Sequence, residues 1–240
     1  RLRISSIALP PLGCGLGGLN WSEVKPMIEE AFESVPEVRA LLFEPVGAPE
    51  ARSMPVGTPR PGLTVARALL ILLMKRYSES AYRLTLLEIQ KLAYFLQESG
   101  QPLRLKYEAG YYGPYAANLN KVLETLEGHF TRGYGDCQKP DVEIELLPKA
   151  DEEAESFLSE NKESEDRLQQ VADLIDGFET PYGMELISSV HWVARYGHPR
   201  ALESTQARES LHHWNERKRK MFRAEHVKIA WVRLLEKGWL

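Results

Sequence analysis

Cysteine is scarce in this chain, which has only Cys14 and Cys137 among its 240 residues. Neither lies in a spacing typical of metal ligands, and two thiols make no disulfide framework. No metal is therefore expected, and a reducing cytoplasm is the expected location. Long apolar runs are missing as well. The most apolar stretch, residues 68–74, is too short to cross a bilayer, so no membrane partner is expected.

A recognisable catalytic set is also missing. The sequence shows no nucleophile accompanied by a base, no paired carboxylates at a pocket and no set of metal ligands. His212 and His213 with His226 suggest zinc at first sight, but adjacent helical residues face different directions and no cysteine is near. We therefore expect no catalytic residue, and binding is favoured over catalysis.

Charge is distributed unevenly along the chain, although the total is only −4. Residues 141–190 hold 15 acidic side chains against three basic ones, a net charge of −12. Residues 191–240 hold 11 basic against five acidic side chains, a net charge of +6. An acidic segment followed by a basic one indicates charged partners, or packing of the two segments against each other. The basic run 217–220 is expected to be an exposed helix turn that pairs with the acidic segment.

Residues 1–45 have the pattern of one β-α-β unit. A strand is predicted over 4–9, a helix over 22–33 with Ser22 as its N-cap, and a second strand over 38–43. Such a short sheet needs cover on both faces, and the chain begins without Met, directly before its first strand. We therefore expect the sequence to be a fragment of a longer protein.

Residues 46–62 contain four prolines and three glycines without an apolar period, which predicts a linker. Residues 63–240 are then predicted to form a mainly α-helical domain, in which Thr85 and Glu88 form a capping box. A turn is predicted at Gly113-Pro114. One helix is expected to begin at this capping box and to end just before Gly100, and another follows the turn with Leu119, Val122, Leu123 and Leu126 on one face. Further helices are expected over 62–80, 151–161, 164–177, 181–196, 211–223 and 225–237, with an edge strand over 142–147. The predicted fold class is α+β, a partial β-α-β unit followed by a helical domain with a small edge strand or hairpin.

Glycine is concentrated between the first strand and the first helix, where four glycines occur in the six residues 13–18. Glycines at such a junction let backbone N–H groups approach an anion, and the helix N-terminus adds a favourable dipole. A tight turn without a ligand is the simpler explanation, but such a turn requires fewer than the four glycines found here. The spacing also fits a dinucleotide fingerprint, with Glu44 at the end of the next strand as its acidic partner. That alternative is a nucleotide-dependent enzyme whose glycine loop binds a cofactor diphosphate.

The stretch SIALPPLGCGLGGLNW, with the helix after it and Phe43-Glu44-Pro45, resembles the last third of a macrodomain. It is most similar to the DarG family, the DNA ADP-ribosyl glycohydrolase antitoxins of DarT–DarG toxin–antitoxin systems. The resemblance implies that the loop binds ADP-ribose as a ligand rather than a cofactor, mainly through backbone N–H groups. The implied ligand-binding residues are Gly13, Cys14, Gly15, Leu16, Gly17, Gly18 and Leu19.

Catalysis does not carry over with this resemblance. An acidic residue that acts within the loop of a related glycohydrolase aligns with Gly17, and the catalytic lysine of the family lies on an earlier segment that this chain lacks. The longer parent protein is expected to be a hydrolase that acts on ADP-ribosylated DNA. This fragment is expected to be inactive.

The helical part resembles the C-terminal region of the same family. The similarity is carried by the motifs KLAYFLQ from Lys91, YYGPYA from Tyr111, LEGHF from Leu126 and GYGD from Gly133. It implies that the partner is a DarT-type toxin, which ADP-ribosylates thymidine on single-stranded DNA, and that this region neutralises it.

A protein that blocks a groove for single-stranded DNA would present acids in place of phosphates and flat rings in place of bases. Our hypothesis assigns these roles to Tyr111, Tyr112, Tyr115, Glu152, Glu153 and Asp173. The simpler alternative is a solvated acidic helix face with tyrosines in the core. A toxin-binding antitoxin and a nucleotide-dependent enzyme therefore both remain as hypotheses.

Overall fold

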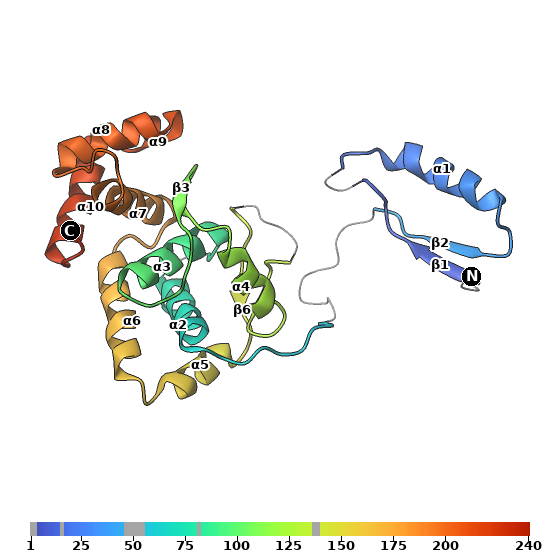
Figure 1. The fold of residues 1–240 in the computed structure, drawn as a ribbon, viewed down its shortest axis with the longest axis horizontal. Helices are drawn as coiled ribbons and strands as arrows, with labels where there is room; N and C mark the ends of the chain where they lie inside the picture. The colour runs from blue at the N-terminus through green and yellow to red at the C-terminus, as the bar shows by residue number, and fades with distance from the viewer. Residues whose placement is uncertain (1–3, 15–16, 46–55, 81–82, 136–139) are drawn as a thin grey trace. The chain divides into compact units, whose positions relative to one another are not determined.

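The computed structural model describes residues 4–14, 17–45, 56–80, 83–135 and 140–240. The chain divides into two compact units, Arg1–Met54 and Pro55–Leu240 (Figure 1). Each unit is described by itself below. The fold is a mixed α+β fold, mostly helical, with three small two-stranded sheets in the described segments. Among the helices of these segments, none has the length and apolarity that a membrane crossing requires.

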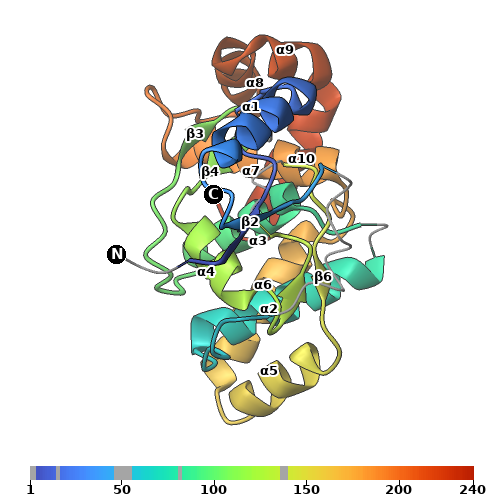
Figure 2. The same ribbon diagram turned by 90° about the vertical axis from the view of Figure 1, so that its right-hand side faces the viewer.

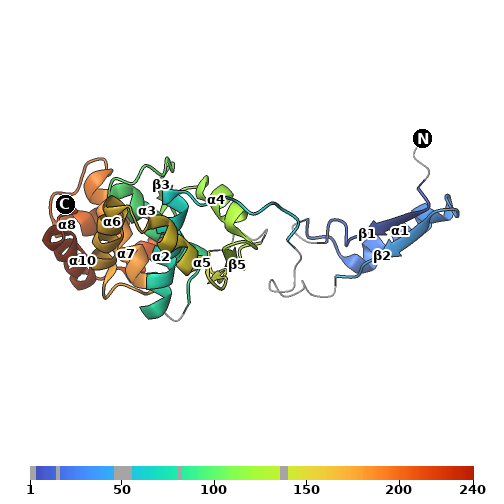
Figure 3. The same cartoon turned by 90° about the horizontal axis from the view of Figure 1, so that it is seen from below.

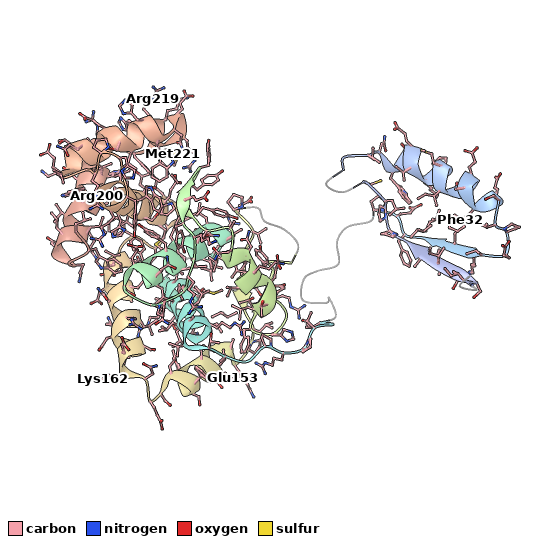
Figure 4. All side chains as sticks on the ribbon, viewed as in Figure 1. Phe32, Glu153, Lys162, Arg200, Arg219 and Met221 are labelled. Atoms are coloured by element: carbon pink, nitrogen blue, oxygen red, sulfur yellow. The ribbon has the colours of Figure 1, made fainter. Side chains whose placement is uncertain are left out.

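The N-terminal unit consists of two parallel strands and one helix. Strand β1 (Ser6–Leu9) pairs with β2 (Arg39–Leu42), and α1 (Trp21–Glu33) connects them. Figure 3 shows α1 lying along the strand pair, and Phe32 lies between the helix and the strands in Figure 4. No residue of α1 is fully buried, and Met27 is 69% exposed. This unit therefore buries little apolar surface of its own.

The N-cap of α1 differs from the prediction. Asn20 has extended backbone angles, and its side chain accepts a hydrogen bond from the N–H of Ser22 at 3.1 Å. Ser22 is thus inside the helix, and the prediction of Ser22 as the cap is wrong by two residues. Both side chains can cap a helix, and Trp21 already has helical geometry here.

Helix α2 (Val65–Ser80) runs through the middle of the second unit. Its residues 68–74 are all buried, as expected of the most apolar stretch of the chain. It packs against three helices: α3 (Leu86–Glu98), α5 (Ala150–Leu158) and α6 (Lys162–Ile175). A helix buried on all sides needs apolar side chains all round rather than one stripe, and α2 has them.

The predicted capping box at the start of α3 is confirmed. The Glu88 carboxylate accepts a hydrogen bond from the backbone N–H of Thr85 at 2.8 Å. After α3, a hairpin forms from β3 (Glu108–Gly110) and β4 (Gly113–Tyr115). The two residues of its turn are Tyr111 and Tyr112, so the predicted turn at Gly113-Pro114 is wrong.

Helix α4 (Leu119–Leu126) and the strand pair β5 (Thr131–Arg132) and β6 (Glu145–Leu146) follow the hairpin. The C-terminal part is built around α7 (Pro181–Arg195), which packs against α3 and α10 (Ala224–Glu236). On α7 the expected core histidine is confirmed, because His191 is buried with Nδ1 2.7 Å from the Tyr94 hydroxyl. Burial lowers the pKa of His191 to about 3.

The helix predicted over 211–223 is in fact two helices, α8 (Ser204–Trp214) and α9 (Glu216–Met221). Asn215 breaks them apart with extended backbone angles, and its side chain accepts a hydrogen bond from the N–H of Lys218 at 2.8 Å. The prediction missed this corner because asparagine can either continue a helix or cap the next one.

Candidate functional site

The glycine loop of the N-terminal unit turns sharply between β1 and α1. Gly13 and Gly18 have φ angles of +71° and +66°, which side chains rarely adopt. A Cβ atom on Gly17 would lie 2.6 Å from the carbonyl oxygen of Gly13. Three of the four glycines are therefore required by the shape of the loop. Gly15 and Leu16 lie outside the described residues.

Part of the hydrogen-bonding capacity of this loop is used internally. The N–H of Cys14 donates to the carbonyl of Pro11 at 3.1 Å, and the N–H of Leu19 donates to that of Gly13 at 3.0 Å. Among the described glycines of the loop, Gly13, Gly17 and Gly18 donate no backbone hydrogen bond to another described residue. Glu44, the partner required by the dinucleotide hypothesis, instead pairs with Lys25 of α1 at 2.9 Å.

The tyrosine hairpin, residues 108–115, is attached to α3 by two adjacent side chains. The Gln90 amide exchanges two hydrogen bonds with the backbone of Ala116, at 3.0 and 3.1 Å. Lys91 Nζ donates to the carbonyl of Pro114 at 2.6 Å. The motifs that begin at Lys91 and Tyr111 are thus joined directly in space.

The corner between α8 and α9 holds the hairpin from its other side. Trp214 Nε1 donates to the carbonyl of Gly110 at 3.1 Å, and the Asn215 amide donates to that of Tyr111 at 3.0 Å. The guanidinium of Arg217 lies over the Tyr112 ring, 4.8 Å from its centre. The hairpin is therefore fixed by segments that are about a hundred residues away in the sequence.

The three tyrosines of the toxin-binding hypothesis lie together on this hairpin. Tyr111 is 58% exposed, and its ring meets Tyr112 edge-on at 4.8 Å between ring centres. Tyr115 is half-buried, and its hydroxyl accepts a hydrogen bond from Asn120 at 3.0 Å. All three line a cavity of about 250 Å³ between the hairpin and the first turns of α3. Gln90 and Lys91 line the same cavity.

A buried cluster of charges lies behind the hairpin. Glu185 of α7 is 1% exposed and accepts hydrogen bonds from Arg217 Nη1 at 2.5 and 2.6 Å and from Lys218 Nζ at 2.8 Å. Lys218 is fully buried and also donates to Ser189 at 3.1 Å. Burial lowers the pKa of Lys218 against the opposing attraction of Glu185.

This cluster corrects the prediction for the basic run 217–220. Arg217 and Lys218 do pair with a residue of the acidic segment, but Lys218 is buried rather than exposed. Arg219 and Lys220 are exposed, and they pair with Glu216 of their own helix. The sequence could not show this because a charged side chain inside a helical pattern normally faces solvent.

Lys91 is almost fully buried beside the same cluster. Burial, together with repulsion from Lys218, lowers the pKa of Lys91 to about 7 against the attraction of Glu185 and Glu88. Nothing in the local sequence indicates that Lys91, Gln90 and Glu185 are buried. The only available signal was that Lys91 begins one of the family motifs.

The acids of the hypothesis lie elsewhere in the unit. Glu152 is exposed on α5, whereas Glu153 pairs with Arg60 at 2.9 Å. Asp173 on α6 accepts a hydrogen bond from Gln169 at 2.6 Å. Glu153 on α5 and Arg219 on α9 lie at opposite ends of the unit in Figure 4, and Figure 2 shows the same separation of the two helices. The structure therefore does not bring Glu152 and Glu153 together with the tyrosines.

Comparison with family models gives no match for this chain. Comparison with individual proteins does. A protein of Thermus aquaticus named DNA ADP-ribosyl glycohydrolase is 45% identical over 240 residues, which covers all of this chain and 66% of that protein. A protein of the same name from Mycobacterium tuberculosis is 34% identical over 255 residues, covering 98% of this chain and 70% of that protein. The chain thus spans about two thirds of the length of these relatives.

Proposed function

The chain belongs to the family of DNA ADP-ribosyl glycohydrolases, and from this membership we propose that it is an antitoxin that binds and inhibits a DarT-type toxin. The second unit, Pro55–Leu240, is the inhibitory part of this proposal. The N-terminal unit is proposed to be the end of a macrodomain. The substrate of the longer protein would be ADP-ribosylated DNA, as the names of the relatives suggest.

The observation that carries the proposal is the outward acidic surface of α5 and α6. A set of exposed acids on and next to these helices forms no ion pair with any described residue: Glu152, Glu155, Glu160, Glu165, Asp166 and Asp176. A toxin that binds single-stranded DNA needs a positively charged groove. Unpaired carboxylates on rigid helices are suited to occupy such a groove in place of phosphates.

Two acids of the original hypothesis have a reduced role in this proposal. Glu153 of α5 pairs with Arg60, and this ion pair connects the segment before α2 to α5. The guanidinium of Arg60 also lies 4.7 Å from the centre of the Phe130 ring. Asp173 is already engaged by Gln169. Tyr111 remains the most exposed tyrosine of the hairpin and the best suited of the three to stack on a partner.

The glycine loop is proposed to bind the diphosphate of ADP-ribose within the complete macrodomain. Gly17 and Gly18 offer the backbone N–H groups for this contact, and α1 begins three residues after Gly18. No catalytic residue is proposed within this chain. The alternative, a nucleotide-dependent enzyme, stays a hypothesis; in the structure its acidic partner Glu44 forms an exposed pair with Lys25.

The test is a titration of toxin activity. ADP-ribosylation of a thymidine-containing single-stranded oligonucleotide by a DarT-type toxin is measured against increasing concentrations of this chain. We expect inhibition at a stoichiometric ratio, without release of ADP-ribose from DNA that was modified beforehand. Release of ADP-ribose would instead assign an enzymatic function to the chain.

Charge reversal tests the surface itself. The double variant Glu152→Lys, Glu165→Lys places repulsive charges on α5 and α6, and we expect the concentration for half-inhibition to rise at least about tenfold, or about 1.4 kcal/mol. The matched control is Glu209→Lys, Glu236→Lys, which changes the net charge equally on exposed positions of α8 and α10. Equal effects of the two double variants would show that total charge matters and the α5–α6 surface does not.

A further inference from the structure

The cavity beneath the tyrosine hairpin has the size of a side chain. Its volume is about 250 Å³, below the roughly 300–1,000 Å³ of typical small-molecule sites. Most of its wall is apolar, formed by residues of the hairpin, by Pro140 and by Leu86 and Leu87 at the start of α3. Such a pocket is typical of a contact in which a protein partner inserts one residue.

Lys91 gives this cavity its chemical character. Its ammonium group has three N–H donors, and the hydrogen bond to the carbonyl of Pro114 uses one of them. No ion pair joins it to a carboxylate in the described part of the chain. Glu88, one turn earlier on α3, has one oxygen in the capping box with Thr85.

The neighbouring charges leave Lys91 short of a negative partner. Glu185, on α7, is already engaged by two cations of α9, Arg217 and Lys218. Three cations, Lys91, Arg217 and Lys218, thus lie near only two carboxylates, Glu185 and Glu88. A buried cation without a paired anion is energetically unfavourable. A carboxylate in the cavity would balance this charge.

We propose that this cavity receives a glutamate or aspartate side chain of a protein partner, with its methylene groups against the tyrosine hairpin and its carboxylate paired with Lys91. The identification of that partner as the toxin rests on the proposed function. The small and mostly apolar wall favours a carboxylate on an apolar stem over a phosphate, which requires several donors. The partner would therefore present basic groups to α5–α6 and an acid to this cavity.

The first experiment tests carboxylate recognition in the full chain with propionate as the probe. Lysine is labelled with ¹³C at Cε, and the Lys91 signal is assigned by its loss in Lys91→Arg. We expect saturable shifts of this signal and of the Gly110 and Gly113 amides with propionate at pH 6. Affinity should fall about tenfold per unit well above pH 7, because the ammonium form is needed and the pKa of Lys91 is about 7.

Propionamide and inorganic phosphate are the matched probes. Binding of propionamide as tightly as propionate would mean that the cavity is merely apolar, and preference for phosphate would indicate a nucleic acid instead. Either result, or no binding of propionate, overturns the proposal. Tyr111→Ala, at the exposed rim of the cavity, should weaken the binding of propionate without affecting folding. This variant therefore tests the proposal even if Lys91 variants fold poorly.

The second experiment identifies the partner. Lys91→Met should raise the concentration of chain needed for half-inhibition of the toxin about tenfold, whereas Lys220→Met on the exposed side of α9 should leave it unchanged. If the wild-type chain binds propionate but Lys91→Met inhibits the toxin as well as the wild-type chain does, the assignment of the partner as the toxin is overturned. Failure of the wild-type chain to inhibit is a different result, since that outcome refutes the proposed function itself.

Discussion

Replacing Glu185 with glutamine should destabilise the helical unit strongly. The variant keeps the shape of the side chain but leaves Lys218 fully buried without a counter-charge. Breaking a buried ion pair from one side typically costs about 3–5 kcal/mol. Arg217 can turn toward water because its side chain is 25% exposed, whereas Lys218 cannot.

Deprotonation sets an upper limit on this loss. Lys218 can lose its proton and become neutral. At pH 7 this costs about 4.6 kcal/mol for a lysine with an ordinary pKa near 10.4. Burial already lowers the pKa of Lys218, so the cost of deprotonation is smaller than this value. We therefore expect a loss of about 3–4 kcal/mol in the free energy of unfolding. With a urea dependence of about 2–3 kcal/mol per molar, the midpoint should fall by about 1–2 M.

The assay is urea unfolding of the full chain, followed by near-ultraviolet circular dichroism. The matched control is Glu216→Gln, which removes exposed pairs with Arg219 and Lys220 and should cost under about 1 kcal/mol. A combined Glu185→Leu, Lys218→Met variant should recover most of the lost stability, since apolar pairs often replace buried ions without cost. A loss below about 1 kcal/mol in Glu185→Gln would refute the argument that Lys218 depends on this carboxylate.

Two further predictions concern stability. Gly113→Ala should lower the free energy of unfolding, measured with urea, by about 1–3 kcal/mol more than Gly100→Ala does. The two glycines have nearly the same φ angle (+96° and +95°), but only at Gly113 would a Cβ atom meet Ser189 Oγ, at 2.8 Å. Equal losses of stability in the two variants would show that this clash does not occur. Stability should fall by about 2 kcal/mol between pH 7 and pH 5, because unfolded His191 takes up a proton near pH 6.5 and the folded residue, with a pKa of about 3, does not. His191→Gln should flatten this part of the pH profile, and an unchanged profile would show that His191 is not the group responsible.

Periodicity was sufficient to predict most of the helices, because each amphipathic helix carries its buried face in its own sequence. The capping box at Thr85 and Glu88 was predictable for the same reason, since both partners lie within one turn. The corner at Asn215 was missed because its geometry depends on contacts with the hairpin, such as the hydrogen bond to the carbonyl of Tyr111. That partner lies 104 residues away.

The candidate site was predictable only in part. The tyrosines attracted attention by their number, but nothing local indicates that Lys91, Glu185 and Lys218 are buried together. A charged residue on a helix is normally solvated, and only the tertiary structure places these three on facing surfaces of α3, α7 and α9. The acids of α5 and α6 were visible as a charge run, but the engagement of Glu153 by Arg60 was not, because 93 residues separate them.

The proposed toxin contacts can be separated by combining variants. The acids of α5–α6 and the cavity at Lys91 belong to different helices, and Figures 1 and 2 show α5 well apart from the hairpin strand β3. Effects of well-separated substitutions usually add to within about 0.5 kcal/mol. If Glu152→Lys, Glu165→Lys and Lys91→Met each raise the half-inhibiting concentration tenfold, the combined variant should raise it about a hundredfold. An increase of only tenfold would mean that the two substitutions disturb one and the same interaction, and the assignment of two independent contacts would have to be abandoned.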